Sequence, residues 1–300
     1  ESWSVITSMR PAHAVVSAGA YVWAATAGGV LRVDTTTRAV TRFTHLDGLP
    51  RGAVLCAEAV EQLIVANDPE TVSAVIAEPV AAGGCIVPGD AYWPTLREIC
   101  DRYGVVLIAD EVITGFGRAG DWFGSRVWGV APDIICLAKA ITSGYFPLGA
   151  VMLNEKIESA FMQDQEQLAA IYHGYTYSGH PVGCAAALTA LDETFKLDLP
   201  GNSLARGEQI MNRLQALQDE VEIIGEVRGR GLMVGIELVS DRDAKTPLSP
   251  QIAGAIGNAT FDAGTLVRIS GNILILSPPL ILSESEADQI CDALEVGLKS

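Results

Sequence analysis

Apolar segments that alternate with amphipathic ones between residues 71 and 154 constrain the fold more than any other feature of this chain. A strand that is apolar at every position, rather than at every second one, is typical of a parallel sheet buried on both faces. The segments are TVSAVIAEPV, VVLIAD, DIICLA and LGAVMLN. Between the first two, the sequence YWPTLREICDRYG has helical periodicity, and Gly104 can cap it. Its apolar face holds Trp93, Leu96, Ile99, Cys100 and Tyr103. This order predicts an α/β fold with a mostly parallel sheet flanked by helices.

The two ends of the chain have different patterns. Residues 1–52 alternate apolar and polar positions around turn signals such as Gly28-Gly29, which predicts short antiparallel strands. This segment resembles one repeat of a sensor-type β-propeller. From residue 196 onward, helices alternate with short strands, and a capping box at Ser283 to Glu286 opens the last helix. We expect a β-rich segment over 1–52, a large but incomplete α/β domain over 53–195 and a smaller C-terminal α+β domain over 196–300.

The composition excludes several classes of function. The net charge of −16 argues against nucleic acid and against anionic membrane surfaces as partners. The six cysteines form no CxxC pair, and none of the four histidines lies in an HExxH motif, so no metal site is expected. No apolar run is long enough to span a membrane and the N-terminus does not resemble a signal peptide, which favours a cytoplasmic location with reduced thiols.

The strand VVLIAD ends on two carboxylates, Asp110 and Glu111. Ligands of open parallel sheets bind just beyond the carboxyl ends of the strands, so Asp110 is a candidate ligand-binding group. A Walker B role would need the phosphate loop GxxxxGK[ST], which the chain lacks. Two interpretations remain. Asp110 is a charge solvated at a loop, or it pairs with the protonated nitrogen of a pyridine cofactor, which also requires a nearby amine.

Lys139 is a candidate for that amine. It is the only charged residue between Ile134 and Asn154, so we expect it to be desolvated, which favours the neutral amine that attacks carbonyl groups. The alternative is a lysine whose stem is buried and whose ammonium group reaches water. Thr142, Ser143 and the segment HGYTYSGHP add hydroxyl and amide groups of the kind that bind phosphate.

Six motifs together carry a family resemblance. They are AEPV, DEVITGFGR, LAKAITSGYFPLGA, YTYSGHP, RGRGLMVGIEL and LSPPL, in this order over roughly residues 53–300. The ordered set resembles the class III aminotransferases, the pyridoxal 5'-phosphate (PLP) enzymes often called ω-transaminases. The resemblance implies the PLP-dependent transferase fold type I, in which residues 53–195 would form the cofactor-binding domain.

The resemblance also implies roles for individual residues around the cofactor. Lys139 matches the lysine that forms the Schiff base and shuttles the proton. Asp110 matches the carboxylate on the pyridine nitrogen, and Val112 matches the residue packed on one face of the ring. Thr176 matches a threonine that reaches the cofactor phosphate of the neighbouring subunit, which implies a homodimer with shared active sites.

Two further residues are expected near the substrate, and a third is expected to stabilise the turn after Glu111. Glu78 matches a carboxylate near the active site. Arg268 resembles an arginine that binds the substrate carboxylate, although a surface arginine is an equal alternative. Arg118 is interpreted as structural, fastening the turn that follows Glu111.

The implied reaction is a ping-pong transfer of an amino group from an amine or an ω-/α-amino acid to a 2-oxo acid such as pyruvate. The residues before Glu78 contain neither the Ser/Gly phosphate loop nor the ring-stacking aromatic residue that the resemblance implies. We therefore interpret the chain as an N-terminally truncated transaminase that binds PLP poorly. The alternative is an inactive scaffold or interaction protein derived from a transaminase.

Overall fold

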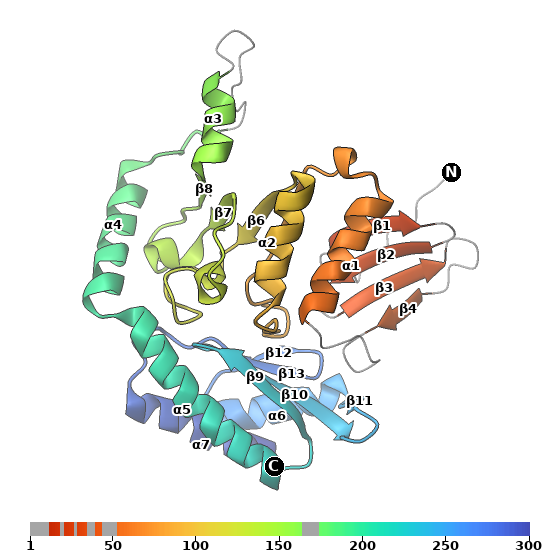
Figure 1. Cartoon of the computed structure of the whole chain (residues 1–300). Coiled ribbons are helices and arrows are strands. Elements are labelled where there is room, and N and C mark those ends of the chain that lie inside the picture. Colours follow the sequence, from red (N-terminus) through yellow and green to blue (C-terminus); the bar gives the residue numbers. More distant parts are fainter. Residues whose placement is uncertain (1–11, 19–20, 27–28, 35–39, 44–52, 164–173) are drawn as a thin grey trace. The chain divides into compact units, whose positions relative to one another are not determined.

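A computed structural model describes residues 12–18, 21–26, 29–34, 40–43, 53–163 and 174–300 (Figure 1). The chain divides into two compact units. The first consists of Glu1–Ser73 and Gly89–Val105, and the second consists of Ala74–Pro88 and Val106–Ser300. The second unit contains every residue for which the sequence predicts a role in the site.

The first unit contains an antiparallel sheet and two helices. The strands β1 (Ala12–Ala18), β2 (Tyr21–Thr26), β3 (Gly29–Asp34) and β4 (Val40–Phe43) pair in chain order, as the alternating pattern predicts. Helices α1 (Ala53–Ala66) and α2 (Tyr92–Tyr103) are joined by Arg102 and Tyr103, which both donate to the Glu61 carboxylate. Gly104 ends α2 in the left-handed conformation (φ 68°), and Pro69–Thr71 forms the short 3-10 helix η2. The predicted apolar face of α2 is buried at Trp93, Leu96, Ile99 and Cys100.

The N-terminal part of the second unit is built on a four-stranded sheet in the order β5-β6-β7-β8. Figure 1 labels three of these strands, β6, β7 and β8. Strands β5 (Ala74–Ala77), β6 (Val106–Asp110) and β7 (Ile134–Leu137) are parallel, and β8 (Ala150–Leu153) is antiparallel to β7. The remaining elements here are the 3-10 helices η3 (Gly124–Trp128) and η4 (Lys139–Thr142) and the helices α3 (Glu155–Gln163) and α4 (Pro181–Lys196).

The two outer strands of this sheet are less buried than their apolar sequences predict. Ile76 of β5 is 47% exposed and Val151 of β8 is 63% exposed, whereas Leu107 and Ala109 of β6 are fully buried. The prediction of burial on both faces is therefore wrong for β5 and β8. Strand side chains project from the faces of the sheet, so the exposure of Ile76 and Val151 means that the elements packed on those faces do not fully cover β5 and β8.

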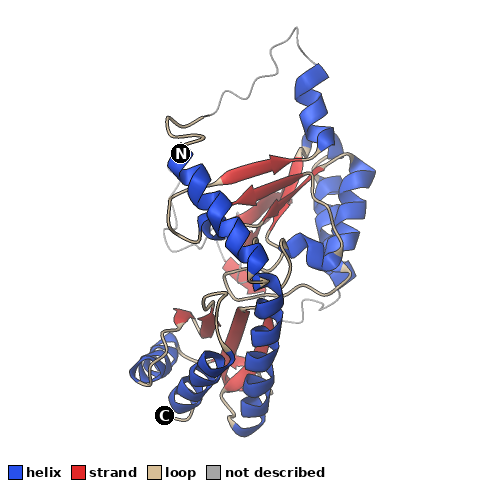
Figure 2. Ribbon diagram, turned by 90° about the vertical axis from the view of Figure 1, so that its left-hand side faces the viewer, coloured by secondary structure: helices blue, strands red, loops and turns tan. Residues whose placement is uncertain are grey.

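The C-terminal part of the second unit contains an antiparallel five-stranded sheet and three helices. Strand β10 (Met233–Asp241) pairs with β9 (Ile224–Arg230), β11 (Thr246–Pro247) and β13 (Ile273–Leu276), and β13 pairs with β12 (Arg268–Ser270). The helices are α5 (Leu199–Glu220), α6 (Pro250–Asp262) and α7 (Glu284–Leu298). The predicted capping box of α7 is present between Ser283 and Glu286. Figure 2 shows the helices in blue and the strands in red.

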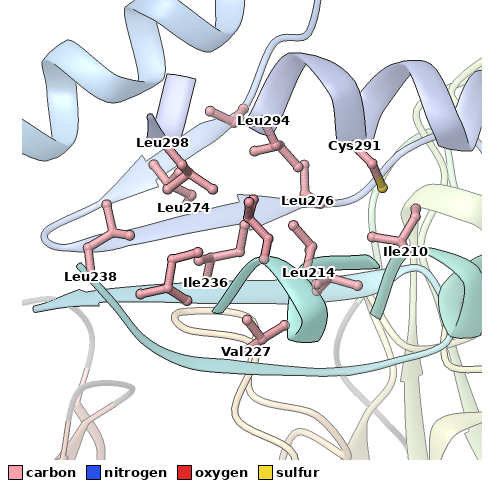
Figure 3. Packing of buried hydrophobic residues seen from close by; sticks show 14 of the residues in the cluster. Ile210, Leu214, Val227, Ile236, Leu238, Leu274, Leu276, Cys291, Leu294 and Leu298 are labelled. Carbon is pink, nitrogen blue, oxygen red and sulfur yellow. The ribbon is translucent and has the colours of Figure 1, made fainter. Parts of the chain in front are cut away.

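Strand alternation explains how this sheet is buried on both faces. Ile236 and Leu238 of β10 point into the largest apolar core of the described chain (Figure 3). Val234, on the same face of the strand, belongs to this core, to which the three helices also contribute. Met233 projects to the opposite face and packs with Val80 and Cys85 of the segment that follows β5. This packing joins the strand ends of the first sheet to the C-terminal sheet and confirms an α/β fold with mixed sheets.

Candidate functional site

Three parallel strands carry the candidate residues to one edge of the sheet. In the register of β5, β6 and β7, Ala77 pairs with Ala109 and Asp110 pairs with Cys136. Glu78 directly follows β5, Asp110 ends β6, and Lys139 comes two residues after β7. Because parallel strands end at the same edge, the two carboxylates and the amine share the edge at which open α/β sheets bind their ligands.

Asp110 is half-buried, and its own turn fixes its side chain. The Val112 amide donates to Asp110 Oδ1 at 3.1 Å, which leaves the second carboxylate oxygen without a described protein donor. Burial raises the pKa of the Cys136 thiol, and the Asp110 charge raises it further. The carboxylate therefore lies close enough to β7 to influence a side chain on the neighbouring strand.

The second of the two charges at the end of β6, the Glu111 carboxylate, is held by hydrogen bonds within the protein. Its side chain is fully buried and accepts three hydrogen bonds, from Thr114 Oγ1 at 2.5 Å and from the amides of Gly124 and Ser125, both at 2.7 Å. The two amides belong to the first turn of η3, where backbone N–H groups have no partner within the helix. Glu111 is thus a structural carboxylate, and Asp110 alone is left for a ligand.

Lys139 is exposed in the structure, so the expectation of a desolvated amine is wrong for the described chain. The prediction relied on the apolar neighbours of Lys139 in the sequence, but the short helix η4 turns the chain outward directly after β7. The backbone of Lys139 lies in the left-handed region with φ 48°. This conformation is costly for a residue with a Cβ atom, and such outliers concentrate at functional sites.

The hydroxyl-rich loop after Lys139 is used mainly for its own structure. Thr142 Oγ1 donates to the Phe146 carbonyl at 2.6 Å, so this hydroxyl is occupied in closing the loop. Phe146 stacks on His180 with ring centroids 5.2 Å apart, and His180 Nδ1 accepts the Val182 amide at the start of α4. The loop and the N-terminus of α4 are therefore packed together, and the binding of phosphate by either segment stays a prediction.

Arg118 has the structural role that the sequence predicts. Its Nη1 donates to the carbonyls of Leu232 at 3.2 Å and Pro278 at 2.5 Å, and the Arg118 carbonyl accepts from the Leu232 amide and from Ser203. Burial lowers the pKa of Arg118 to about 10. The arginine fastens the turn after Glu111 to Leu232, directly before β10, and to the LSPPL segment.

The remaining candidates are more dispersed. Glu78 Oε2 accepts the Ala82 amide at 3.0 Å, and Val112 is half-buried beside Asp110. Arg268 is exposed on β12, and its charge, like that of Arg228, lowers the pKa of the Cys85 thiol in the loop after Glu78. Thr176 is exposed in a turn before α4, and no described contact joins it to Asp110 or Lys139.

Sequence reasoning missed two carboxylates that organise this sheet. One is Glu111, whose spacing to Thr114 was the available signal. The other is Asp133, which is buried and accepts the Leu107 amide at 2.8 Å and Asn154 Nδ2 at 2.9 Å at the amino ends of the strands. A carboxylate directly before an apolar strand was its only sequence signal.

Comparison with known proteins identifies relatives of this chain. An uncharacterised aminotransferase of Sinorhizobium fredii is 41% identical over 249 residues, which cover 81% of this chain and 53% of that protein. The putrescine–pyruvate aminotransferase of Pseudomonas aeruginosa is 40% identical over 240 residues, which cover 79% of this chain and 52% of that protein. The chain thus spans about half the length of the curated relatives it matches.

Solved structures agree with these relatives. An amine transaminase from an uncultivated Pseudomonas species, solved in its PLP-bound form, has a TM-score of 0.80 and 50% identity over 82% of this chain and 56% of that one. An ω-transaminase from Thermomicrobium roseum has a TM-score of 0.78 and 39% identity, covering 82% and 55%.

The described helices include none with both the length and the apolar character needed to cross a bilayer. The profile of the family "Aminotransferase class-III" matches residues 25–298, beginning upstream of residue 53, where the motif resemblance starts. The strand-end residues, the solved structures and this match lead to one conclusion: the chain belongs to the class III PLP-dependent aminotransferases.

Proposed function

We propose that the site at the carboxyl ends of β5, β6 and β7 binds PLP and transfers an amino group from an amine or an ω-/α-amino acid to a 2-oxo acid such as pyruvate. The observation that carries this proposal is the placement of Asp110 and Lys139 at the ends of two adjacent parallel strands. Relatives named putrescine–pyruvate aminotransferase and ω-aminotransferase support the amine donor and the oxo-acid acceptor.

The described donor set fits the two ends of the cofactor ring. Asp110 has one oxygen without a described protein donor, which suits a protonated ring nitrogen. Lys139 supplies a primary amine at the same edge, and a primary amine is the group that condenses with an aldehyde. The phosphate has fewer described partners, because Thr142 is occupied by the Phe146 carbonyl.

Each residue has a distinct part in the proposed chemistry. When bound, the cofactor supplies an acceptor for the electrons released at the substrate carbon. Asp110 would keep the proton on the ring nitrogen, and Lys139 would hold the aldehyde and later take and return the substrate proton. Val112 would pack on the ring, while Glu78 and Arg268 would orient the substrate.

We also propose that two copies of the chain share the site through Thr176. Tyr175 and Tyr177 on either side of it are 75% and 76% exposed, and large exposed apolar side chains are typical of surfaces that become buried in an interface. Sedimentation analysis would test this, because a monomer over the whole micromolar range would contradict it.

We further propose that residues 53–195 form the PLP-binding domain and that residues 196–300 form a smaller domain.

The affinity for PLP is expected to be weak in this 300-residue chain. The chain lacks the Ser/Gly loop implied for the phosphate, and each charge-assisted hydrogen bond lost costs about 1.5–3 kcal/mol.

The test is reconstitution with PLP, followed by borohydride reduction and peptide mapping. A pyridoxyl group on Lys139 that disappears in Lys139→Ala but persists in Lys156→Ala, a change in α3, would support the proposal. Reduction products spread evenly over surface lysines would contradict it. Amino transfer to pyruvate separates an active enzyme from the alternative of an inactive scaffold, which would bind partners without turnover.

A further inference from the structure

We infer that Glu111 is a positioning residue that holds Asp110 in place for the cofactor ring. This inference rests on the proposed function, because the purpose of placing Asp110 is the contact with PLP. The feature that supports it is the set of three hydrogen-bond donors around a fully buried carboxylate directly next to Asp110 in the chain.

The sheet itself holds Asp110 only by its backbone. The last ladder pair joins Asp110 to Cys136, and one further bond runs from the Glu111 amide to the Cys136 carbonyl at 3.0 Å. After that bond the chain leaves the sheet. The side chain of Asp110 is oriented by the Val112 amide, which lies beyond this point. Whatever fixes the turn after Glu111 therefore also fixes the Asp110 carboxylate.

The Glu111 side chain fixes that turn. It connects residue 111 to Thr114 within the turn and to the amides of Gly124 and Ser125, which are 13 and 14 positions further along the chain. The Gly115 amide closes the turn on the Glu111 carbonyl at 3.0 Å. The turn is thus held at both of its ends by one residue.

The packing around this carboxylate leaves little freedom. A Cβ atom added at Gly124 would lie 2.7 Å from Pro79 Cβ, 2.8 Å from Thr114 Cβ and 3.1 Å from Glu111 Oε2. Pro79 follows Glu78 at the end of β5, so the carboxylate is enclosed by the ends of two strands. Only a residue without a side chain leaves room for Glu111 to reach the η3 amides.

Glu111→Gln is the sharpest test because it keeps the shape and changes the hydrogen bonding. Three donors converge on the carboxylate, and the NH₂ group of the substituted amide would face at least one of them as a second donor. The substituted side chain should therefore leave its position and release the turn. Thr114→Val, which removes a single donor, is the milder variant if the first one folds poorly.

Asp133→Asn is the matched control. Asp133 is also a buried carboxylate of the same sheet and accepts from the Leu107 amide and Asn154 Nδ2, but it lies at the amino ends of the strands. Its substitution should lower the stability to a similar degree without moving Asp110.

The first readout needs no cofactor. The pH dependence of Cys136 alkylation, followed by peptide mapping, reports the Asp110 charge because that charge contributes to the raised pKa of this thiol. Asp110→Asn sets the reference by moving the midpoint to lower pH. We expect Glu111→Gln to move it in the same direction and Asp133→Asn to leave it unchanged.

The second readout is the yield of the borohydride-trapped pyridoxyl group on Lys139 at a fixed PLP concentration. Displacement of a contacting group by about 1 Å reduces function roughly ten- to a hundredfold, so Glu111→Gln should lose yield on that scale while Asp133→Asn keeps it. A Cys136 midpoint that is the same in Glu111→Gln, Asp133→Asn and the parent chain would overturn the inference. Absence of the Lys139 adduct in the parent chain would instead contradict the proposed function, and the Cys136 result would still decide the role of Glu111.

Discussion

Asp110 of β6 lies opposite Cys136 of β7 in a parallel register, and the same register carries Lys139 to the edge where Asp110 ends its strand. Two adjacent strands thus end at the same edge of the sheet, one on an acid and the other just before an amine.

Asp110→Asn should weaken PLP binding while leaving the fold intact. The amide cannot hold a proton on the ring nitrogen, so the loss of this charge-assisted contact should cost about 1.5–3 kcal/mol of binding free energy. The measurement is a PLP titration read as Lys139 adduct. Asp121→Asn is the control, because the Asp121 carboxylate pairs with Arg126 at 2.9 Å in a partly exposed ion pair. Equal weakening in both variants would contradict a specific role of Asp110.

The backbone of Lys139 should make glycine the most stable replacement at this position. Lys139 has φ 48°, where a Cβ atom costs roughly 1–2 kcal/mol and glycine avoids that cost. Lys139→Gly should therefore unfold at a higher denaturant concentration than Lys139→Ala, by about 1 kcal/mol. At the next residue the alanine should be more stable than the glycine, so Ala140→Gly should lower the free energy of unfolding, since no such backbone strain is present there. A less stable Lys139→Gly would show that the left-handed backbone carries no strain.

Two helix glycines should respond oppositely to alanine. A Cβ atom at Gly207 of α5 would lie 2.2 Å from the Gly231 carbonyl oxygen, whereas one at Gly254 of α6 would meet nothing within 4 Å. Gly207→Ala must separate α5 from the β9–β10 turn and should destabilise by about 1–3 kcal/mol. Gly254→Ala should stabilise by about 0.5–1 kcal/mol through helix propensity. Urea unfolding of both variants is the measurement, and the same sign in both would refute the close approach.

Cys85 should make the stability of the chain fall at high pH. Burial raises the pKa of its thiol from about 9 to about 11, although the charges of Arg228 and Arg268 oppose the rise. Since the folded pKa is the higher one, the stabilisation is complete below pH 9 and is lost as the pH rises toward 11, by about 2–3 kcal/mol. Cys85→Ala should remove this part of the pH dependence. If the free energy of unfolding falls equally in the parent chain and in Cys85→Ala between these pH values, Cys85 is not the cause of the fall.

Much of the local structure follows from the sequence. The apolar face of α2 with its Gly104 cap, the capping box at Ser283 and the strand that ends at Asp110 are all found as predicted. Each depends on residues at most a few positions apart, so periodicity and capping chemistry suffice to specify it.

The exposure of the outer strands and of Lys139 was predicted wrongly. A continuous apolar run indicates what a segment can tolerate, but burial requires another element to cover it. Packing on the faces of the sheet is incomplete at β5 and β8, and η4 turns Lys139 outward. The roles of Thr176, Arg268 and Val112 remain predictions.

The sequence by itself determined the family and most of the order of strands and helices, and it predicts Asp110 and Lys139 as the residues that hold the cofactor. Only the tertiary structure decided what the second carboxylate does. Glu111 receives its amides from residues 13 and 14 positions away, and the Arg118 side chain donates to carbonyls at positions 232 and 278. Such partners depend on how loops close in three dimensions, because a hydrogen bond requires two groups to meet and the local pattern describes only one of them.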